Sequence, residues 1–440
     1  MWYTGFCRAR AGRLAIFYGN KMGGGKDIGV LSNPSQDALA RVIRYNTVVL
    51  ALCMALGWSV VQLVMGSSAV TLSHLTGSTA WGGLAPGVFL LSWAIASLFM
   101  GRLMDARGRA VGLRAGFAIG VVGTALVYGG VTLESVLAFL SGLTLVGICC
   151  GTVNLARAGG ADMYPRERRA RGISFVLLGA AVGAIISPIV FAPLLAGVHG
   201  GTGGAPWLVV EALLVGGLVI TYGIRIDPVQ ISKQLNVDRS GTADDGALAR
   251  PLRRLIRLPT VPGILFAAVV AQGVMTSLMS IIGVIMIESG HDLAAVSLSM
   301  SVHFVGMFGL VLVAGQVVDW LGRQRSIVLG LLILAFGVLA LVASPGLEAV
   351  LPGMLLIGVG WNVSFVGSTT MLSDATRPVE RARLLGFSDF ASASMAALGA
   401  VLAGVLLGLA GLIPLVMVGS VLVLLPMAVM LSARPNVPQP

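Results

Sequence analysis

Charge is scarce in this chain. Charged residues make up 11% of its 440 residues and hydrophobic residues 56%, whereas about a quarter of an ordinary soluble domain is charged. This composition excludes a soluble globular protein. Because the apolar residues come in long unbroken runs, and because a helix satisfies its own backbone hydrogen bonds in lipid, it indicates an all-α membrane protein.

The chemical groups of most enzymes and metalloproteins are also missing. The sequence has no glycine-rich phosphate loop with a lysine and no serine, histidine and aspartate at a shared depth, so we expect neither an enzyme nor an ATP-driven pump. Carboxylates and cysteines do not cluster inside the apolar runs, so we expect no metal site and no cofactor. The four cysteines give no disulfide framework, and we interpret the adjacent Cys149 and Cys150 as small packing residues.

Twelve apolar runs are each long enough to cross roughly 30 Å of hydrocarbon as a helix of about 20 residues. They lie at 46–72, 81–100, 111–131, 135–159, 172–197, 207–224, 260–287, 294–317, 326–343, 349–371, 384–409 and 411–432. The sequence therefore predicts twelve transmembrane helices.

Positive charge is confined to one side of these predicted spans. All 29 lysines and arginines lie in the N-terminal tail, at the turns after spans 2, 4, 6, 8 and 10, or in the C-terminal tail, if Arg114 and Arg157 at the ends of their spans are counted with the turns after spans 2 and 4. Because cytoplasmic loops carry the excess of lysine and arginine, both termini are predicted in the cytoplasm. The net charge of +11 thus reflects topology, and we expect the lipid bilayer as a partner and no nucleic acid. The 26 arginines against 3 lysines suggest a GC-rich bacterial genome and hence a bacterial inner membrane.

A charged turn occurs twice in the chain. Two glycines, an aspartate and an arginine define it and keep their mutual spacing in both copies. They are Gly101, Asp105, Gly108 and Arg109 after the second span, and Gly315, Asp319, Gly322 and Arg323 after the eighth. The copies lie 214 positions apart, so the chain is a tandem duplication.

A second charged turn is duplicated at an offset of 213 positions. Its shared residues are Pro165, Glu167 and Arg168 after span 4, and Pro378, Glu380 and Arg381 after span 10. Duplicated halves of several apolar spans are the layout of a secondary transporter, whose equivalent helices face each other across a pseudo-two-fold axis with a site between them.

The duplication predicts five parts of the chain. These are a disordered cytoplasmic tail over 1–45, a six-helix bundle over 46–224, a cytoplasmic linker over 225–259, a second six-helix bundle over 260–432, and a C-terminal tail over 433–440. The basic segment from Pro251 to Arg257 is either a short helix on anionic lipid or a solvated tether. Translation could begin at Met1 or at Met22, and both starts stay open.

With twelve spans in two halves and these turns, residues 46–432 resemble the major facilitator superfamily. The turn after spans 2 and 8 matches that family's signature, except that Ala106 and Trp320 stand where the family has a basic residue. The resemblance implies two pseudo-symmetric six-helix bundles, and it implies that the charged residues of both duplicated turns close the cytoplasmic side. Asp105 would accept hydrogen bonds from a neighbouring helix N-terminus or pair with Arg168 or Arg171. The alternative is a solvated turn whose charges only set topology.

Polar side chains deep in hydrocarbon are costly and so point to function. Six of them lie on spans that the resemblance assigns to the central cavity or its flank: Gln62, Asn154, Gln272, His303, Trp361 and Asn362. Amides can orient a solute by hydrogen bonding, and an indole offers an aromatic face. The alternative is that these groups only hold neighbouring helices together.

Proton coupling requires a titratable group that the cavity can reach. His303 is the first candidate, because an ordinary imidazole changes its charge near neutral pH. Glu211 and Asp389 are the others, and for both the favoured interpretation is that they bond neighbouring helices while neutral or paired.

Together these features predict a secondary transporter that moves a small organic solute by alternating access, possibly coupled to protons, and that works as a monomer. Uptake of a nutrient and efflux of a drug stay open. A membrane receptor or assembly protein on the same fold is the alternative, and it predicts degraded turn signatures and no polar cavity. The sequence instead keeps the turn signature in both copies and has polar residues deep in the spans, which favours the transporter.

Overall fold

Helices make up nearly all of the chain that the structure describes. The structure is a computed structural model, and it describes residues 34–77, 84–186, 204–240, 249–291, 293–343 and 346–432. The helices of the first half are α2 (Pro34–Thr76), α3 (Leu84–Arg107), α4 (Arg109–Thr132), α5 (Val136–Asn154), α6 (Ala156–Met163), the 3-10 turn η2 (Arg166–Arg168), α7 (Arg169–Ile186) and α9 (Ala205–Thr221).

The second half repeats this arrangement after a helical linker. The linker contains α10 (Pro228–Ser240) and α11 (Leu252–Ile256). The helices of the second half are α12 (Val261–Glu288), α13 (Leu293–Phe304), the π turn η4 (Val305–Gly309), α14 (Val311–Leu321), α15 (Arg323–Ala343), α16 (Leu347–Asp374), α17 (Pro378–Ala410) and α18 (Leu412–Ser432).

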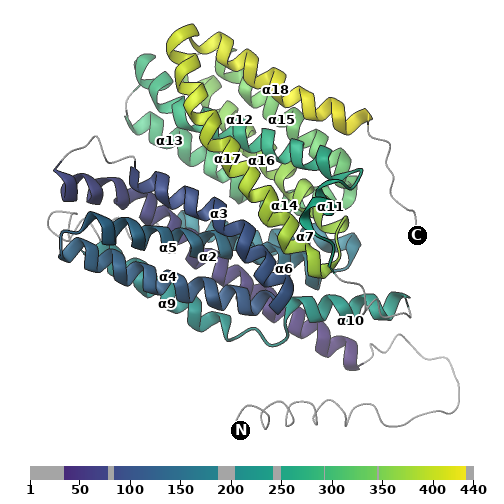
Figure 1. Ribbon diagram of the computed structural model, residues 1–440. Helices are drawn as coiled ribbons and strands as arrows, with labels where there is room; N and C mark the ends of the chain where they lie inside the picture. The colour runs from purple at the N-terminus through teal and green to yellow at the C-terminus, as the bar shows by residue number, and fades with distance from the viewer. Residues whose placement is uncertain are drawn as a thin grey trace, which may run out of the picture. The chain divides into compact units, whose positions relative to one another are not determined.

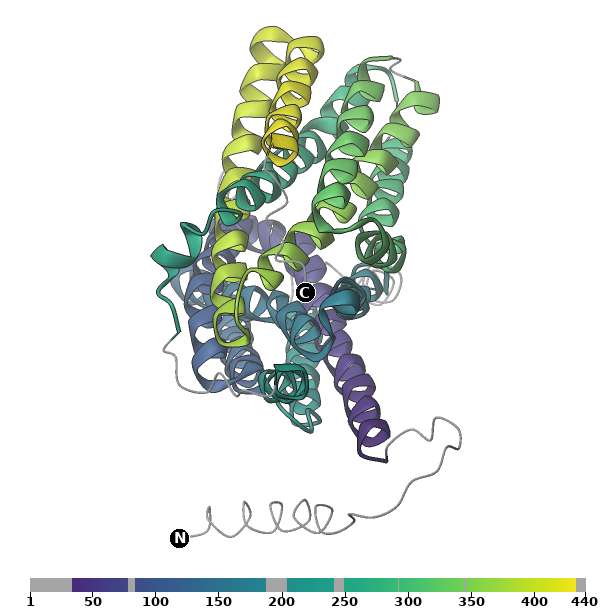
Figure 2. The same cartoon turned by 90° about the vertical axis from the view of Figure 1, so that its right-hand side faces the viewer.

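The helices gather into two groups that follow the duplication (Figures 1 and 2). In the first group α4 packs against α5 and α9, and in the second α15 packs against α16 and α18. Glycines permit the close approach of α15 and α16, because a Cβ on Gly360 would lie 2.4 Å from the Leu334 nitrogen. Two pairs of helices join the groups, α3 with α17 and α7 with α14, and these pairs are equivalent under the repeat.

Nine helices of the described chain are long and apolar enough to cross a membrane, and ten if a bent pair counts as one span. The bent pair is Leu298–Gly309 with Val311–Leu321, which meet at 45°. Pro206–Thr221 is a shorter apolar helix, and the predicted span 172–197 is described only to residue 186. Twelve spans and the cytoplasmic position of both termini therefore stay predictions.

Two segments outside the predicted spans are helical. The helix α2 already begins at Pro34, so the predicted disorder is wrong for residues 34–45, and residues 1–33 lie outside the described chain. In the linker, the segment from Pro251 to Arg257, for which a short helix on lipid and a solvated tether were both left open, contains the short helix α11, and α10 was not predicted.

Candidate functional site

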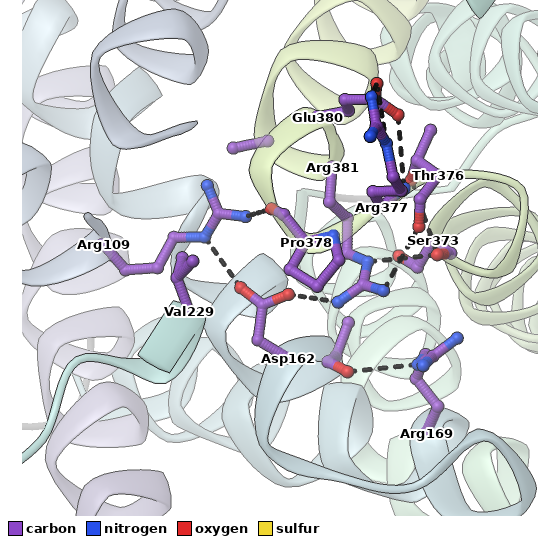
Figure 3. A network of polar contacts seen from close by, with 12 residues as sticks. Arg109, Asp162, Arg169, Val229, Ser373, Thr376, Arg377, Pro378, Glu380 and Arg381 are labelled. Carbon is purple, nitrogen blue, oxygen red and sulfur yellow. Dashed lines mark hydrogen bonds and ion pairs between the residues drawn. The ribbon is translucent and has the colours of Figure 1, made fainter. Parts of the chain in front are cut away.

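Asp105 and Arg109 of the first duplicated turn belong to a chain of four buried ionic side chains that reaches the other half of the molecule. We name Asp105, Arg109, Asp162 and Arg381 the N-terminal ion network. Arg109 donates from Nη1 to Asp105 at 2.6 Å. It also donates from Nε to Asp162 at 2.8 Å, and Arg381 donates to the other oxygen of Asp162 (Figure 3). Two acids and two bases thus compensate each other, as buried charges require.

Asp105 also holds the start of α17. Its carboxylate accepts the backbone N–H groups of Ala382 at 3.0 Å and Arg383 at 2.8 Å. The same helix receives Arg109, whose Nη2 donates to the carbonyl oxygen of Pro378 at 2.6 Å. Asp105 therefore accepts hydrogen bonds near the start of a neighbouring helix, as predicted, although the two amides belong to its second turn.

The second copy repeats these contacts with the halves exchanged. We name Asp319, Arg323, Asp374 and Arg169 the C-terminal ion network. Arg323 donates from Nε to Asp374 at 3.1 Å, and Arg169 donates to the other oxygen of that carboxylate. Asp319 accepts the backbone N–H groups of residues 170 and 171 at 3.3 and 3.2 Å, near the start of α7. Both copies therefore tie the two halves together at the same, arginine-rich end of the helices.

The two networks differ in burial. The side chain of Arg109 is 0% exposed and that of Arg323 is 18% exposed. The linker lies over the N-terminal network, since α10 packs against α6 and α17. At the end of the linker, Arg250 donates to Glu380 from its backbone nitrogen at 2.7 Å and from Nη2 at 2.7 Å. Charges there are shielded from water more completely than in the second copy.

The signature glycines are explained by backbone geometry. Gly108 and Gly322 adopt φ values of 101° and 89°, a region that residues with a Cβ rarely occupy. Gly101 and Gly315 lie at the contact between the halves, and a Cβ on Gly101 would lie 2.5 Å from the Ala382 carbonyl oxygen. Each glycine therefore either reverses the chain or lets the opposite helix approach.

The predicted pairing of Asp105 with Arg168 or Arg171 is wrong. Arg168 is exposed and makes no ion pair within the described chain, while Arg171 lies 3.5 Å from Asp319 in the other network. Glu167 is exposed as well. The arginine equivalent to Arg381 is instead Arg169.

The structure adds three residues that the sequence analysis missed, Asp162, Asp374 and Arg169. Asp374 lies 212 positions after Asp162, and Arg381 lies 212 positions after Arg169. The residues of the duplicated turn between them, such as Pro165 and Pro378, are 213 positions apart. That shorter offset was the available signal in the sequence.

A second contact between the halves lies deeper in the helices. Asp389 on α17 accepts hydrogen bonds from Asn154 Nδ2 at 3.0 Å and from Arg157 Nη2 at 2.5 Å. Arg157 also donates to the Asn154 carbonyl oxygen at 2.7 Å, and its guanidinium lies 5.1 Å from the centre of the Phe365 ring. The predicted candidates Asn154 and Asp389 are thus brought together by Arg157.

Gln272 and Trp361, two more predicted site residues, bond to each other. The indole Nε1 of Trp361 donates to Gln272 Oε1 at 2.8 Å, and Gln272 Nε2 donates to Thr276 at 3.0 Å. Trp361 stacks on Phe365 with ring centres 4.8 Å apart, which links this pair to Arg157. Gln272 remains partly exposed between α12 and α16, so its amide is still accessible.

His303 and Asn362 lie beside the π turn instead. His303 is fully buried and donates from Nδ1 to the Met354 carbonyl oxygen at 3.0 Å, and Asn362 Nδ2 lies 3.5 Å from the Gly306 carbonyl oxygen inside η4. A π turn leaves carbonyl groups poorly paired, and a side chain that reaches them supports the bend. The structure therefore does not bring these two side chains together with Gln272.

The remaining candidates have few contacts. Gln62 on α2 and Glu211 on α9 are partly exposed, and neither makes a hydrogen bond within the described chain. Among the described residues no group of three or more histidines, cysteines and acids could hold a metal ion. Cys53, Cys149 and Cys150 are free and buried.

Comparison with known proteins gives consistent matches over most of the chain. Residues 47–400 and 264–440 match the family model described as Major Facilitator Superfamily. The MFS-type transporter YdeG of Bacillus subtilis is 30% identical over 381 residues, which covers 83% of this chain and 86% of that protein. The riboflavin transporter RfnT of Brucella anthropi is 26% identical over 374 residues, which covers 84% of this chain and 91% of that protein. The human organic anion transporter MFSD10 has a crystal structure similar to this fold, with a TM-score of 0.71 at 15% identity, over 88% of this chain and 99% of that one.

Proposed function

The chain belongs to the major facilitator superfamily, and from this premise we propose that it is a secondary transporter that moves a small organic solute by alternating access. The observation that carries the proposal is the pair of equivalent ion networks. They join the two halves at the arginine-rich end through side chains of opposite charge. Such networks can form when that end closes and separate when it opens. A receptor on this fold would not need two of them.

The proposed topology follows from the distribution of arginine. We assign the arginine-rich end to the cytoplasm, with both termini there, and residues 46–224 and 260–432 to two six-helix bundles in a bacterial inner membrane. In this state the cytoplasmic side is closed, so the solute would enter from the opposite side. One chain contains both halves, and we expect the monomer to function. The riboflavin transporter among the relatives supports an organic solute rather than an inorganic ion.

Asp389 is the proposed proton-binding group, in preference to His303 and Glu211. It belongs to one half, and its two partners, Asn154 and Arg157, belong to the other. Protonation would remove the negative charge that holds Arg157 and would weaken the contact between the halves. His303 lies away from this contact, and its Nδ1 bonds within the second half, to the Met354 carbonyl oxygen.

Alternating access is tested by distances between spin labels in proteoliposomes. The exposed Leu133 and Leu409 carry one pair of labels at the arginine-poor end, and the exposed Arg168 and Trp320 carry another at the arginine-rich end. Cys7 is replaced by serine, and the buried cysteines stay. We expect two populations, in which one pair of labels is far apart when the other is close. A single distance for both pairs would refute the proposal.

The role of Asp389 is tested with the same labels. Asp389→Asn removes the negative charge as protonation would, so it should shift the populations toward the state that is open at the arginine-rich end, because it weakens the contact with Arg157. His303→Gln should leave the populations unchanged. If His303→Gln produced the shift and Asp389→Asn did not, the assignment would be reversed.

A further inference from the structure

Six aromatic rings form an unbroken row across the contact between the two halves. We name this the aromatic row: Phe89, Trp93, Trp58, Phe308, Trp361 and Phe365. Neighbouring ring centres along it are 6.0, 5.9, 5.1, 6.2 and 4.8 Å apart. The contact of 5.1 Å between Trp58 on α2 and Phe308 in η4 joins the first half to the second. We propose that the aromatic row is the floor of the solute site and that it selects a flat, uncharged aromatic solute that carries a hydrogen-bond acceptor. This inference rests on the proposed transport function and specifies its substrate class.

The row concentrates aromatic residues in a chain that has few of them. Aromatic residues make up 6% of the sequence, yet three of the five tryptophans in the described chain belong to the row. The other two serve different environments, since Trp207 packs on Phe139 and Trp320 is exposed. Aromatic rings also fill the core elsewhere, but the row differs because it crosses from one half to the other.

Part of the row remains accessible although it lies between the halves. Trp58, Trp93 and Phe365 are partly exposed, whereas Phe308 and Trp361 between them are buried. Trp58 contacts a ring of the other half, so its exposed part lies beside the contact between the halves. Most contacts in the row are edge to face, with interplanar angles of 65° to 90°. A flat solute can join such an arrangement through its own edge or face.

The polar groups along the row favour a solute without net charge. Arg157 lies over Phe365 at one end, but Asp389 already neutralises it. Of the buried donors that have no acceptor within the described chain, two lie along the row, the indole N–H of Trp58 and the Nε–H of Arg157. Unpaired buried donors are costly, and a solute carbonyl or ring nitrogen would satisfy one of them. The floor therefore supplies donors and ring faces but no unpaired charge.

Three matched probes test this inference on the purified full-length protein in detergent. They are 2-quinolone, which is flat and carries a ring carbonyl; naphthalene, which is flat and has no acceptor; and octahydro-2-quinolone, which keeps the carbonyl but has saturated rings. Equilibrium dialysis measures the binding of each probe. We expect 2-quinolone to bind about tenfold more tightly than the saturated lactam, because only the flat ring makes aromatic contacts.

The variant Trp58→Phe keeps a ring in the row and removes its N–H group. It should weaken the binding of 2-quinolone about fivefold, the effect of one net hydrogen bond, and leave naphthalene unchanged. Trp207→Phe, outside the row, is the matched control and should change neither. Absent binding of 2-quinolone, equal binding of its saturated analogue, or an equal effect of Trp58→Phe on all probes would overturn the inference.

The spin-label experiment separates this result from the proposed function. A protein that alternates between two states but does not prefer the flat probe contradicts only the substrate class. A protein that binds 2-quinolone as expected but stays in one state contradicts alternating access and leaves the aromatic row as a binding site.

Discussion

Replacing Asp162 by asparagine tests whether the N-terminal ion network holds the arginine-rich end closed. Asp162 accepts from both Arg109 and Arg381, and asparagine removes its charge at nearly constant volume. Arg381 is then left without a carboxylate partner in the described chain. Breaking a buried ion pair in this way costs roughly 3–5 kcal/mol. The cost falls on the closed state, because the guanidinium regains water when the halves separate.

The expected shift is large enough to measure directly. At about 1.4 kcal/mol per factor of ten, a cost of roughly 3 kcal/mol changes the ratio of closed to open molecules about 100-fold or more. Labels at Arg168 and Trp320 report the two populations as two distances. The matched control is Asp374→Asn in the C-terminal network, where Arg323 is 18% exposed and water partly screens the charge. We expect a shift of about tenfold there.

A third variant distinguishes charge balance from loss of a hydrogen bond. Asp162→Asn combined with Arg381→Gln removes one acid and one base, so the double variant should recover most of the closed population. The reasoning is refuted if Asp162→Asn changes the ratio less than twofold, if Asp374→Asn has the larger effect, or if the double variant is more open than the single one.

Two further predictions concern the turns and the linker. Gly108→Ala should lower the thermal melting temperature more than Gly322→Ala. Both substitutions impose backbone strain of roughly 1–3 kcal/mol at positive φ, but only at Gly108 would the new Cβ also lie 2.5 Å from a carboxylate oxygen. Equal melting temperatures of the two variants would contradict this. Arg250→Gln should speed amide hydrogen exchange in the first turn of α17, because Arg250 bonds to Glu380 there. The control Arg253→Gln, at an exposed residue of the linker, should not change the exchange rate. An unchanged exchange rate in Arg250→Gln would show that the linker does not stabilise this helix.

The structure also changes the view of the predicted site. Deep polar residues were all expected to converge on one cavity, but they divide into three sets. Asn154 and Asp389 join the halves, Gln272 and Trp361 lie on the aromatic row or beside it, and His303 lies beside the bent helix. The cost of a polar group in lipid explains why the side chains of these three sets have polar partners, but it does not say whether such a partner is a solute or another helix.

The sequence by itself determined what depends on composition and on spacing along the chain. Scarce charge and long apolar runs indicate a helical membrane protein, the duplicated turns reveal two equivalent halves, and the signature glycines mark the reversals at Gly108 and Gly322. The tertiary structure alone decided which residues meet. Asp162 pairs with Arg381 from a distance of 219 positions, Arg169 rather than Arg168 reaches Asp374, and Asn362 supports the π turn. The helical period fixes the direction in which a side chain points around its own helix. The rotation and depth of one helix against its neighbour depend instead on how all the helices of the bundle pack. That packing is set by contacts between residues far apart in the sequence.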